Sequence, residues 1–222
     1  MKQLYPDLWQ TQPERPVPSE PEATAHAYLL IRDGGGILFY STGREAIGQA
    51  DDEADLRQIE ELGGITHQLL AHWHEASSSL PRIKQRFDAA LGVHERDAAA
   101  VRKASGVGPD LPLQARETLL GDIEVIPTPG HTAGSTCFRY RSPHGRTYLF
   151  TGDTIVPNRD SWMAAAFEDD AGQPRLRKSL ELLREVDPDV VLAAGALNSD
   201  TCREVSPASW RSALDAATAS LS

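Results

Sequence analysis

The sequence predicts an α/β fold in which two mixed β-sheets pack face to face and helices cover both outer faces, a four-layer αββα sandwich. The prediction comes from two halves of the chain, each of which has segments typical of strands followed by segments typical of helices. With 222 residues, 40% of them hydrophobic and 24% charged, the chain can bury the core of one large domain. We expect this domain over residues 24–222, after an irregular lead-in over residues 1–23 that carries five prolines.

The first half begins with a predicted hairpin. Residues 24–32 and 37–42 are apolar runs typical of strands, and the glycine-rich segment 33–36 supplies a tight turn between them. Residues 51–64 have acidic residues in their first turn and glycines at their end, which is the pattern of a helix. A strand over residues 65–72 follows and leads directly into a histidine-rich turn.

The middle of the chain alternates helices and strands. Residues 80–92 predict a helix, residues 93–97 a short strand, and residues 97–106 a second helix that ends at a glycine. Residues 117–130 and 135–153 are typical of consecutive strands joined by turns, and the segment Ser-Pro-His-Gly within the second of them has good turn chemistry.

The chain closes with a helix, a strand and a helix. Residues 174–186 form an amphipathic pattern, and residues 189–195 are an apolar run typical of a buried strand. The last helix is expected over residues 206–221, with Ser206 as its N-cap and Pro207 at its first position.

Composition bears on the partners of this protein. The formal net charge is −10 and no cluster of Lys and Arg occurs, so neither nucleic acid nor an anionic membrane surface is an expected partner. No apolar run approaches the roughly 20 residues that span a bilayer, and the first residues lack the pattern of a signal peptide. Cys137 and Cys202 make no disulfide framework, although one bridge between them stays open. We therefore expect a cytoplasmic protein that acts on a small-molecule substrate.

Four residues that can bind metal each follow a predicted strand. They are His72, His74, His131 and Asp153. Rigid scaffolds present functional groups where strands end and loops begin. Three imidazoles and one carboxylate suit zinc, which takes nitrogen and oxygen ligands in tetrahedral geometry. Residues 156–173 follow Asp153 directly, are long for a connection, and are expected to line the mouth of the site.

At these residues the chain resembles a known family. The segments "HWHEAS", "TPGHTAGS", "TGDT" and "VVLAAGALN" resemble, in order and approximate spacing, the metallo-β-lactamase superfamily, with the glyoxalase-II-like branch as the expected relative. The resemblance covers roughly residues 24 to 220. It implies the αββα fold, His72, His74 and His131 as ligands of the first metal, and Asp153 as the carboxylate that bridges two metals in the family.

The sequence departs from the family pattern at three positions. Ala76, Ser77 and Ala196 stand where the family has an Asp and two His. All three departures remove ligands of the second metal, so the resemblance implies a mononuclear site. One alternative stays open, in which a residue near position 196 replaces the missing histidine: Asn198, Asp200 or Cys202.

The resemblance implies hydrolysis of an ester, thioester, lactone or amide by a zinc-bound hydroxide, with Asp153 completing the coordination or holding the water and accepting its proton. One alternative is a mononuclear Fe(II) dioxygenase of the persulfide type, which would use two histidines and Asp153. Another is a binding protein that keeps the fold without catalysis. We expect Glu75, which lies at the variable position of the motif, to be a solvated or helix-capping carboxylate, and Trp73 to serve in packing.

Overall fold

The N-terminal half of the chain forms a seven-stranded mixed sheet. The computed structural model describes residues 1–16, 19–43, 52–166 and 171–221, and the strand order in this sheet is β1-β2-β4-β5-β6-β7-β8. The neighbouring strands β1, β2, β4 and β5 pair antiparallel, whereas β5, β6, β7 and β8 pair parallel. The strands are β1 (Lys2–Tyr5), β2 (Leu8–Gln10), β4 (Tyr28–Leu30), β5 (Gly36–Phe39), β6 (Ile65–Leu69), β7 (Ala90–His94) and β8 (Leu111–Leu113).

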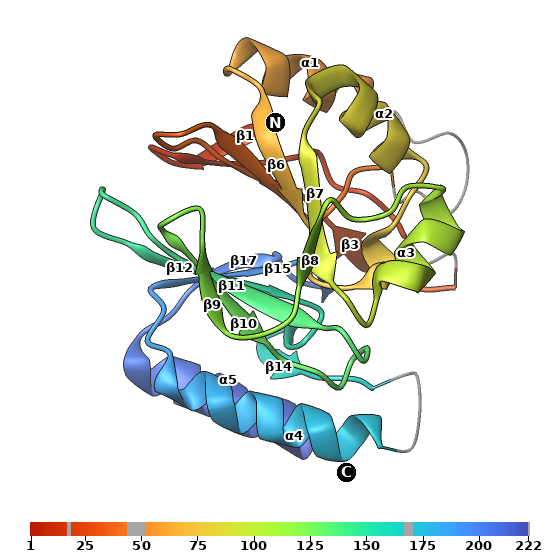
Figure 1. Ribbon diagram of the computed structural model, residues 1–222. Helices are drawn as coiled ribbons and strands as arrows, with labels where there is room; N and C mark the ends of the chain where they lie inside the picture. The colour runs from red at the N-terminus through yellow and green to blue at the C-terminus, as the bar shows by residue number, and fades with distance from the viewer. Residues whose placement is uncertain (17–18, 44–51, 167–170, 222) are drawn as a thin grey trace.

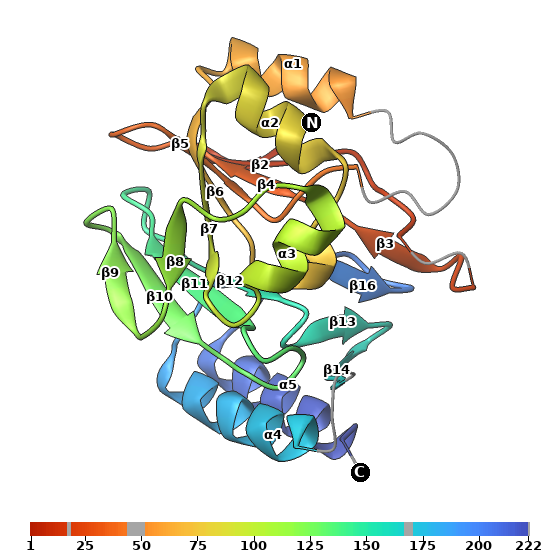
Figure 2. The same cartoon turned by 45° about the vertical axis from the view of Figure 1, so that its right-hand side comes forward.

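The C-terminal half forms a six-stranded sheet with the order β17-β15-β12-β11-β10-β9. Only the β12–β15 pair of this sheet is parallel. A smaller sheet, β14-β13-β16-β3, lies along one edge of the molecule (Figure 2). The strands of these two sheets are β3 (Ala23–Ala25), β9 (Glu117–Leu119), β10 (Ile123–Pro127), β11 (Thr136–Arg141), β12 (Thr147–Gly152), β13 (Val156–Asn158), β14 (Ser161–Met163), β15 (Val190–Ala193), β16 (Gly195–Leu197) and β17 (Cys202–Glu204).

Helices cover both outer faces, which confirms the predicted αββα arrangement. Figure 1 shows α1, α2 and α3 on the outer side of the seven-stranded sheet, and α4 and α5 on the outer side of the six-stranded sheet. The helix α5 has the expected Ser206 cap, and Pro207 occupies its first position. The helices are α1 (Glu53–Glu61), α2 (Ser79–Phe87), α3 (Ala98–Ser105), α4 (Gly172–Leu182) and α5 (Pro207–Ala219), with short 3₁₀ helices η1 (Trp73–Glu75) and η2 (Leu183–Glu185).

Three expectations about local structure are corrected. Residues 2–10 are not an irregular lead-in, because β1 and β2 form a hairpin that joins the first sheet through β4 and buries Leu8 completely. The run 24–32 is not one strand but two, β3 and β4, which belong to different sheets. The helix expected to reach residue 92 ends at Phe87, where Asp88 adopts a left-handed conformation with φ 52° and β7 begins two residues later.

The main core lies between the two large sheets. Phe39 of β5 stacks on Phe150 of β12 with ring centroids 3.7 Å apart, and it also contacts Phe138 of β11 at 5.6 Å. All three rings are completely buried. A second core cluster packs α4 and α5 against the outer face of the six-stranded sheet, with Trp210 of α5 buried among its members. Burial of aromatic surface on this scale holds the sheets at a fixed separation.

The topology brings four strand ends to the same region. Because β6 and β7 run parallel, their carboxyl ends lie at one edge of the first sheet. In the second sheet β10 and β12 both pair antiparallel with β11, so their carboxyl ends also lie at a common edge. The segments that follow β6, β10 and β12 carry the histidines and the aspartate that the sequence predicts as metal ligands.

Candidate metal centre

The four predicted ligands come together in one cluster. His72 and His74 follow β6, His131 lies in the loop after β10, and Asp153 directly follows β12. One ring nitrogen from each histidine lies within 4.8 Å of the other two. His74 Nδ1 is 3.0 Å from His131 Nε2, and Asp153 Oδ2 is 3.3 Å from His72 Nε2 and 3.9 Å from His131 Nε2. The sheets therefore place two ligands from each half of the chain around a single point.

The three imidazole rings stand nearly perpendicular to one another. The angle between ring planes is 86° for His72 and His74, 89° for His72 and His131, and 89° for His74 and His131. His72 and His131 are buried, whereas His74 is exposed at the rim. Perpendicular rings can direct three nitrogens at one point without stacking on each other, which is compatible with three ligands of a tetrahedral ion.

A backbone carbonyl determines which nitrogen of His131 faces the cluster. Its Nδ1 lies 2.9 Å from the carbonyl oxygen of Ala165. Because a carbonyl only accepts, Nδ1 must carry the proton, and Nε2 then offers a lone pair to the cluster. Ala165 lies in the segment 156–173 that we expect at the mouth of the site, and the structure describes this segment except for residues 167–170.

Two carboxylates flank His72. Glu75 Oε1 is 3.1 Å from Nδ1, on the opposite side of the ring from Asp153. Burial alone would lower the pKa of His72, but the negative charges of Glu75 and Asp153 outweigh it and raise the pKa to about 10. In contrast, loss of surrounding water and the positive charges on His72 and His131 lower the pKa of His74 to about 3. His72 therefore binds a proton tightly, and a metal cation bound at this imidazole would take the place of that proton.

Glu75 differs from its sequence-based expectation. Its side chain is completely buried, so it is neither solvated nor a helix cap. Its Oε2 accepts a hydrogen bond of 2.8 Å from the backbone N–H of Ala71. At Gly152, φ is 54°, and a Cβ there would stand 2.4 Å from Ala71 Cβ and 3.5 Å from both Glu75 Oε1 and His72 Nδ1. Glycine therefore keeps the end of β12 close to the His72–Glu75 pair.

A second buried carboxylate, Asp97, joins the two histidine-bearing segments. Its Oδ2 accepts from the N–H of Trp73 at 2.9 Å and from the hydroxyl of Thr132 at 2.7 Å, and its Oδ1 accepts from the N–H of Gly134 at 2.8 Å. A Cβ at Gly134 would lie 2.5 Å from Asp97 Oδ1, so only glycine allows this contact. The sequence analysis missed Asp97, although its position at the end of a predicted strand was a signal that could have found it.

Ala76, Ser77 and Ala196, which the sequence resemblance aligns with second-metal ligands, lie in other contacts. The Ser77 hydroxyl donates to the backbone oxygen of Thr42 at 2.6 Å and thereby ties two loops together. Ala76 packs against a small apolar cluster, and Ala196 lies on β16 opposite Thr24, with 4% of its surface exposed. Within the described residues, the triad of His72, His74 and His131 is the one group of three or more His, Cys, Asp or Glu side chains that could hold a metal ion.

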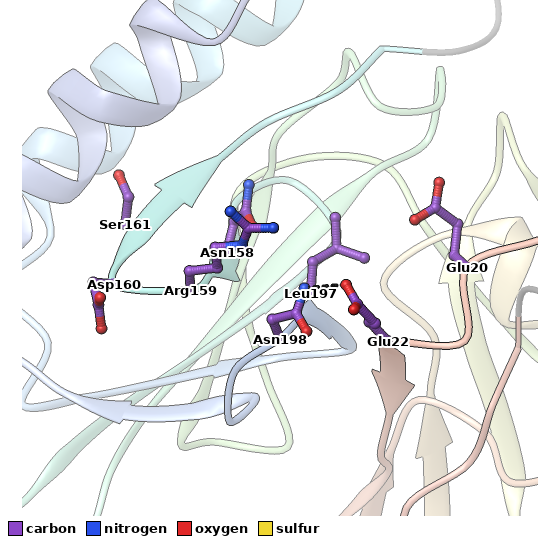
Figure 3. A pocket seen from close by; sticks show the side chains of 8 residues that line it. All are labelled: Glu20, Glu22, Asn158, Arg159, Asp160, Ser161, Leu197 and Asn198. Carbon is purple, nitrogen blue, oxygen red and sulfur yellow. Dashed lines mark hydrogen bonds between the residues drawn. The ribbon is translucent and has the colours of Figure 1, made fainter.

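The residues near position 196 do not join the triad. Asn198 donates its side-chain amide to Glu22, the contact drawn as a dashed line in Figure 3. Both residues line a separate open cavity of 540 Å³ between β13, β16 and the segment before β3. Asp200 is exposed, and Cys202 lies on β17, paired with Leu192. The cavity includes none of the four predicted ligands.

The cluster fits a metal ion. Both ring nitrogens of His72 and Oε1 of Glu75 are buried, and none has a hydrogen bond of normal geometry to the described residues. His74 Nδ1 and His131 Nε2, only 3.0 Å apart, cannot both present lone pairs there unless a proton or a cation lies between them. A cation bound by the three nitrogens satisfies the inward-facing nitrogen of each ring.

Comparison with known proteins identifies the family. The model of the metallo-beta-lactamase superfamily matches residues 25–195, and the chain belongs to this superfamily. No curated protein sequence matches the chain. The glyoxalase-II-like branch and the loss of the second metal stay predictions.

Solved structures show the same fold at low sequence identity. A metallo-β-lactamase from Pontibacter korlensis has a TM-score of 0.70 and 15% identity, with 99% of this chain and 97% of that chain covered. ETHE1 from Myxococcus xanthus has a TM-score of 0.68 and 17% identity, covering 96% and 84%. A motif mutant of a metallo-β-lactamase from Cronobacter sakazakii has a TM-score of 0.65 and 19% identity, covering 87% and 79%. No helix among the described residues is long and apolar enough to cross a membrane.

Proposed function

We propose that this chain is a metal-dependent hydrolase that uses one zinc ion to cleave an ester, thioester, lactone or amide bond in a small molecule. The observation that carries the proposal is the convergence of His72, His74 and His131, whose ring nitrogens lie within 4.8 Å of one another, beside the Asp153 carboxylate. Membership of the metallo-β-lactamase superfamily supports it, because the matched residues 25–195 include all four of these side chains.

The donor set favours zinc. Three neutral imidazoles and one carboxylate are ligands that zinc binds readily, and an ion held by three histidines keeps a fourth position for a water or a substrate. Zinc in such a site lowers the pKa of a bound water to about 7 and polarises a carbonyl group. The exposed position of His74 leaves the cluster open to solvent on one side, through which a substrate can enter.

Asp153 is the proposed catalytic residue. Its side chain is 28% exposed, in contrast to the buried His72 and His131 beside it, so it reaches both the cluster and the solvent. A carboxylate in this position accepts a hydrogen bond from a water molecule, orients it toward the substrate carbonyl and takes its proton as the new bond forms. The same oxygen, Oδ2, faces the Nε2 atoms of two histidines, which hold it in place.

The side chains at the expected second-metal positions support a proposal of one metal rather than two. The Ser77 hydroxyl is engaged with Thr42, and Ala76 and Ala196 have no donor atoms. A site with one ion lacks the second charge that stabilises the leaving group in two-metal hydrolases. We therefore propose modest activity on generic substrates.

A second candidate is a mononuclear Fe(II) dioxygenase acting on a persulfide. Its specific support is the face formed by His72 Nε2, His131 Nε2 and Asp153 Oδ2, since two histidines and one carboxylate are the ligands of many iron oxygenases. A binding protein without catalysis is the third candidate, and a zinc ion closed by all four ligands with no open position would favour it.

The test is the metal content of tag-free protein by inductively coupled plasma mass spectrometry, followed by assays on a panel of esters, thioesters, lactones and amides. We expect about one zinc per chain and zinc-dependent hydrolysis, both lost in His131→Ala. His144→Ala is the matched control, because His144 is exposed in the turn after β11 and should leave both unchanged.

Other results would redirect the proposal. One iron per chain, together with oxygen consumption on a persulfide, would establish the dioxygenase. Two metals per chain would contradict the mononuclear site. A protein that binds no metal, or binds zinc without hydrolysing any substrate of the panel, would contradict the hydrolase and leave the binding protein.

A further inference from the structure

Glu75 is a buried carboxylate whose burial needs compensation. Its side chain is 0% exposed, and moving an ionised carboxylate out of water costs several kcal/mol unless hydrogen bonds and a positive partner offset the loss. Oε2 has one donor, the N–H of Ala71 at 2.8 Å. Oε1 lies 3.1 Å from His72 Nδ1, an ion-pair distance, although the contact lacks the geometry of a normal hydrogen bond. The group nearest to Oε1 that can offset its charge is therefore the imidazole of His72, a predicted metal ligand.

We propose that Glu75 is a positioning residue for His72: it keeps the proton on Nδ1 and so directs the lone pair of Nε2 to the metal. The inference rests on the proposed metal site. A carboxylate accepts and does not donate, so Nδ1 must be the protonated nitrogen wherever the contact forms. Partners of this kind fix the ring of a metal-binding histidine and make it a better donor.

Comparison of the two buried histidines supports this reading. His131 has the same proton arrangement, but its Nδ1 faces the neutral carbonyl of Ala165 at 2.9 Å. His72 has a charged acceptor in the corresponding place, which makes its Nε2 the more basic of the two. The acceptor is also close in sequence, since Glu75 is three positions after His72, and the short helix η1 returns its side chain toward the imidazole.

The hydrogen bond from the Ala71 N–H to Glu75 Oε2 fixes the orientation of the Glu75 carboxylate toward His72. Ala71 precedes His72, so the backbone N–H that holds Oε2 belongs to the same strand end that carries the imidazole. Gly152 leaves room for the pair, since a Cβ there would lie 3.5 Å from both His72 Nδ1 and Glu75 Oε1. The carboxylate is thus fixed at one oxygen and free to orient the ring with the other.

The substitution Glu75→Gln separates positioning from packing. It conserves the shape of the side chain and removes the buried charge, but an amide has one accepting oxygen where a carboxylate has two. If that oxygen keeps Ala71, the NH₂ group faces His72 Nδ1 and favours the ring form with its proton on Nε2, which cannot bind a metal through that atom. If the amide turns round, the N–H of Ala71 loses its acceptor.

The experiment measures zinc affinity by competition with a chromophoric chelator in the full-length protein and in Glu75→Gln. We expect the variant to bind zinc about 10- to 100-fold more weakly, the range found for partners of metal-bound histidines. The metal-free variant should still unfold in one cooperative transition, which shows that it keeps the fold. Glu124→Gln is the matched control, since Glu124 of β10 pairs with Arg116 and Arg139 outside the cluster, and its zinc affinity should not change.

A spectroscopic readout completes the test. In the zinc-loaded protein, ¹H–¹⁵N NMR of the imidazoles should show a proton on His72 Nδ1, and this signal should be lost or moved in Glu75→Gln. Unchanged zinc affinity and an unchanged His72 signal in the variant would overturn the role of Glu75 while the metal site stands. Zinc binding that is weakened as expected, in a protein that hydrolyses nothing, would leave the role of Glu75 and remove the hydrolase. No zinc binding by the unmodified protein would overturn both.

Discussion

The turn after β6 and the segment around β16 both include positions where the family resemblance predicts metal ligands, yet they are built differently. The turn over residues 72–77 presents His72 and His74 to the cluster and encloses Glu75 beneath them. The segment over residues 195–202 has a small, buried side chain at Ala196, and its Asn198 amide donates a hydrogen bond to Glu22.

The difference lies in what holds each segment. Side-chain hydrogen bonds from outside fix the first: Asp97 binds its backbone at Trp73, and Thr42 accepts from Ser77. The second pairs through its backbone with β3 and β13, and its side-chain hydrogen bonds join Asn198 to Glu22 and Thr201 to Gln10 and Tyr28 rather than to the histidine-bearing turn. Metal ligands need side chains held within a fraction of an ångström, and in the first segment the supporting contacts lie directly beside the two histidines.

The largest effect on this comparison is expected from Asp97→Ala. The change removes the acceptor of three donors on the two histidine-bearing segments while the site, 1% exposed at Asp97, admits little water. We expect a loss of about 3 kcal/mol in the free energy of unfolding, measured by urea denaturation, because each unsatisfied buried donor costs about 1–3 kcal/mol and small shifts recover part of it. Zinc binding should weaken in parallel.

Asp215→Ala is the control for that change. Asp215 lies on α5 with 67% of its side chain exposed, in a surface ion pair with Arg184. Exposed pairs contribute roughly 0–1 kcal/mol, so stability and zinc affinity should both stay close to those of the unmodified protein. An Asp97→Ala variant as stable as this control would mean that Asp97 does not hold the two segments together.

Much of this organisation could be predicted from the sequence, and the part that could not has a physical reason. The period of apolar residues predicts strands and helices because burial repeats with the backbone geometry, and the four ligands could be recognised from short motifs. Glu75 and Asp97 belong to no such motif. The strand end before Asp97 signals where its side chain lies, but its role depends on partners that are distant in sequence: Asp97 and Thr132 are 35 positions apart. Prolines predict irregular backbone for residues 1–23, but residues 2–10 form a hairpin because β2 pairs with β4, a strand beyond the proline-rich stretch.

A smaller effect is expected from Asp52→Asn, which tests the contacts behind the turn. Burial raises the pKa of Asp52, but hydrogen bonds from Ser79, Thr42 and Arg82 outweigh it and lower the pKa below its usual value. A depressed pKa means that the carboxylate stabilises the fold above its ordinary pKa of about 3.9 and that this contribution is lost as the pH falls further. The variant should lose about 1–2 kcal/mol at pH 7, because it weakens hydrogen bonds to a charged acceptor.

The pH dependence makes this prediction specific. Urea denaturation of metal-free protein at pH 7 and at about pH 3, below the ordinary pKa, gives the difference between variant and unmodified protein at each pH. We expect the difference to shrink at the lower pH, because Asp52 binds a proton more readily in the unfolded chain than in the folded protein, and its contribution to stability falls accordingly. An equal difference at both values would show that the charge of Asp52 contributes nothing and that shape alone matters.

The smallest effect is expected on the other side of the comparison, at the residues near position 196. Asn198 is engaged with Glu22, and burial, followed by the charges of Glu204 and Asp200, raises the pKa of the Cys202 thiol to about 12. A thiol that stays protonated at neutral pH is a poor metal ligand, because the thiolate is the form that binds.

Zinc affinity should therefore change by less than about twofold in Asn198→Ala, in Asp200→Ala and in Cys202→Ser, when measured by the same chelator competition as for Glu75→Gln. We expect these variants to differ from Glu75→Gln because a side chain changes zinc affinity mainly when it binds the ion itself or contacts one of its ligands. A tenfold loss in any of the three would identify a substitute for the histidine that is missing at Ala196, and the segment around β16 would then count as part of the metal centre rather than as its contrast.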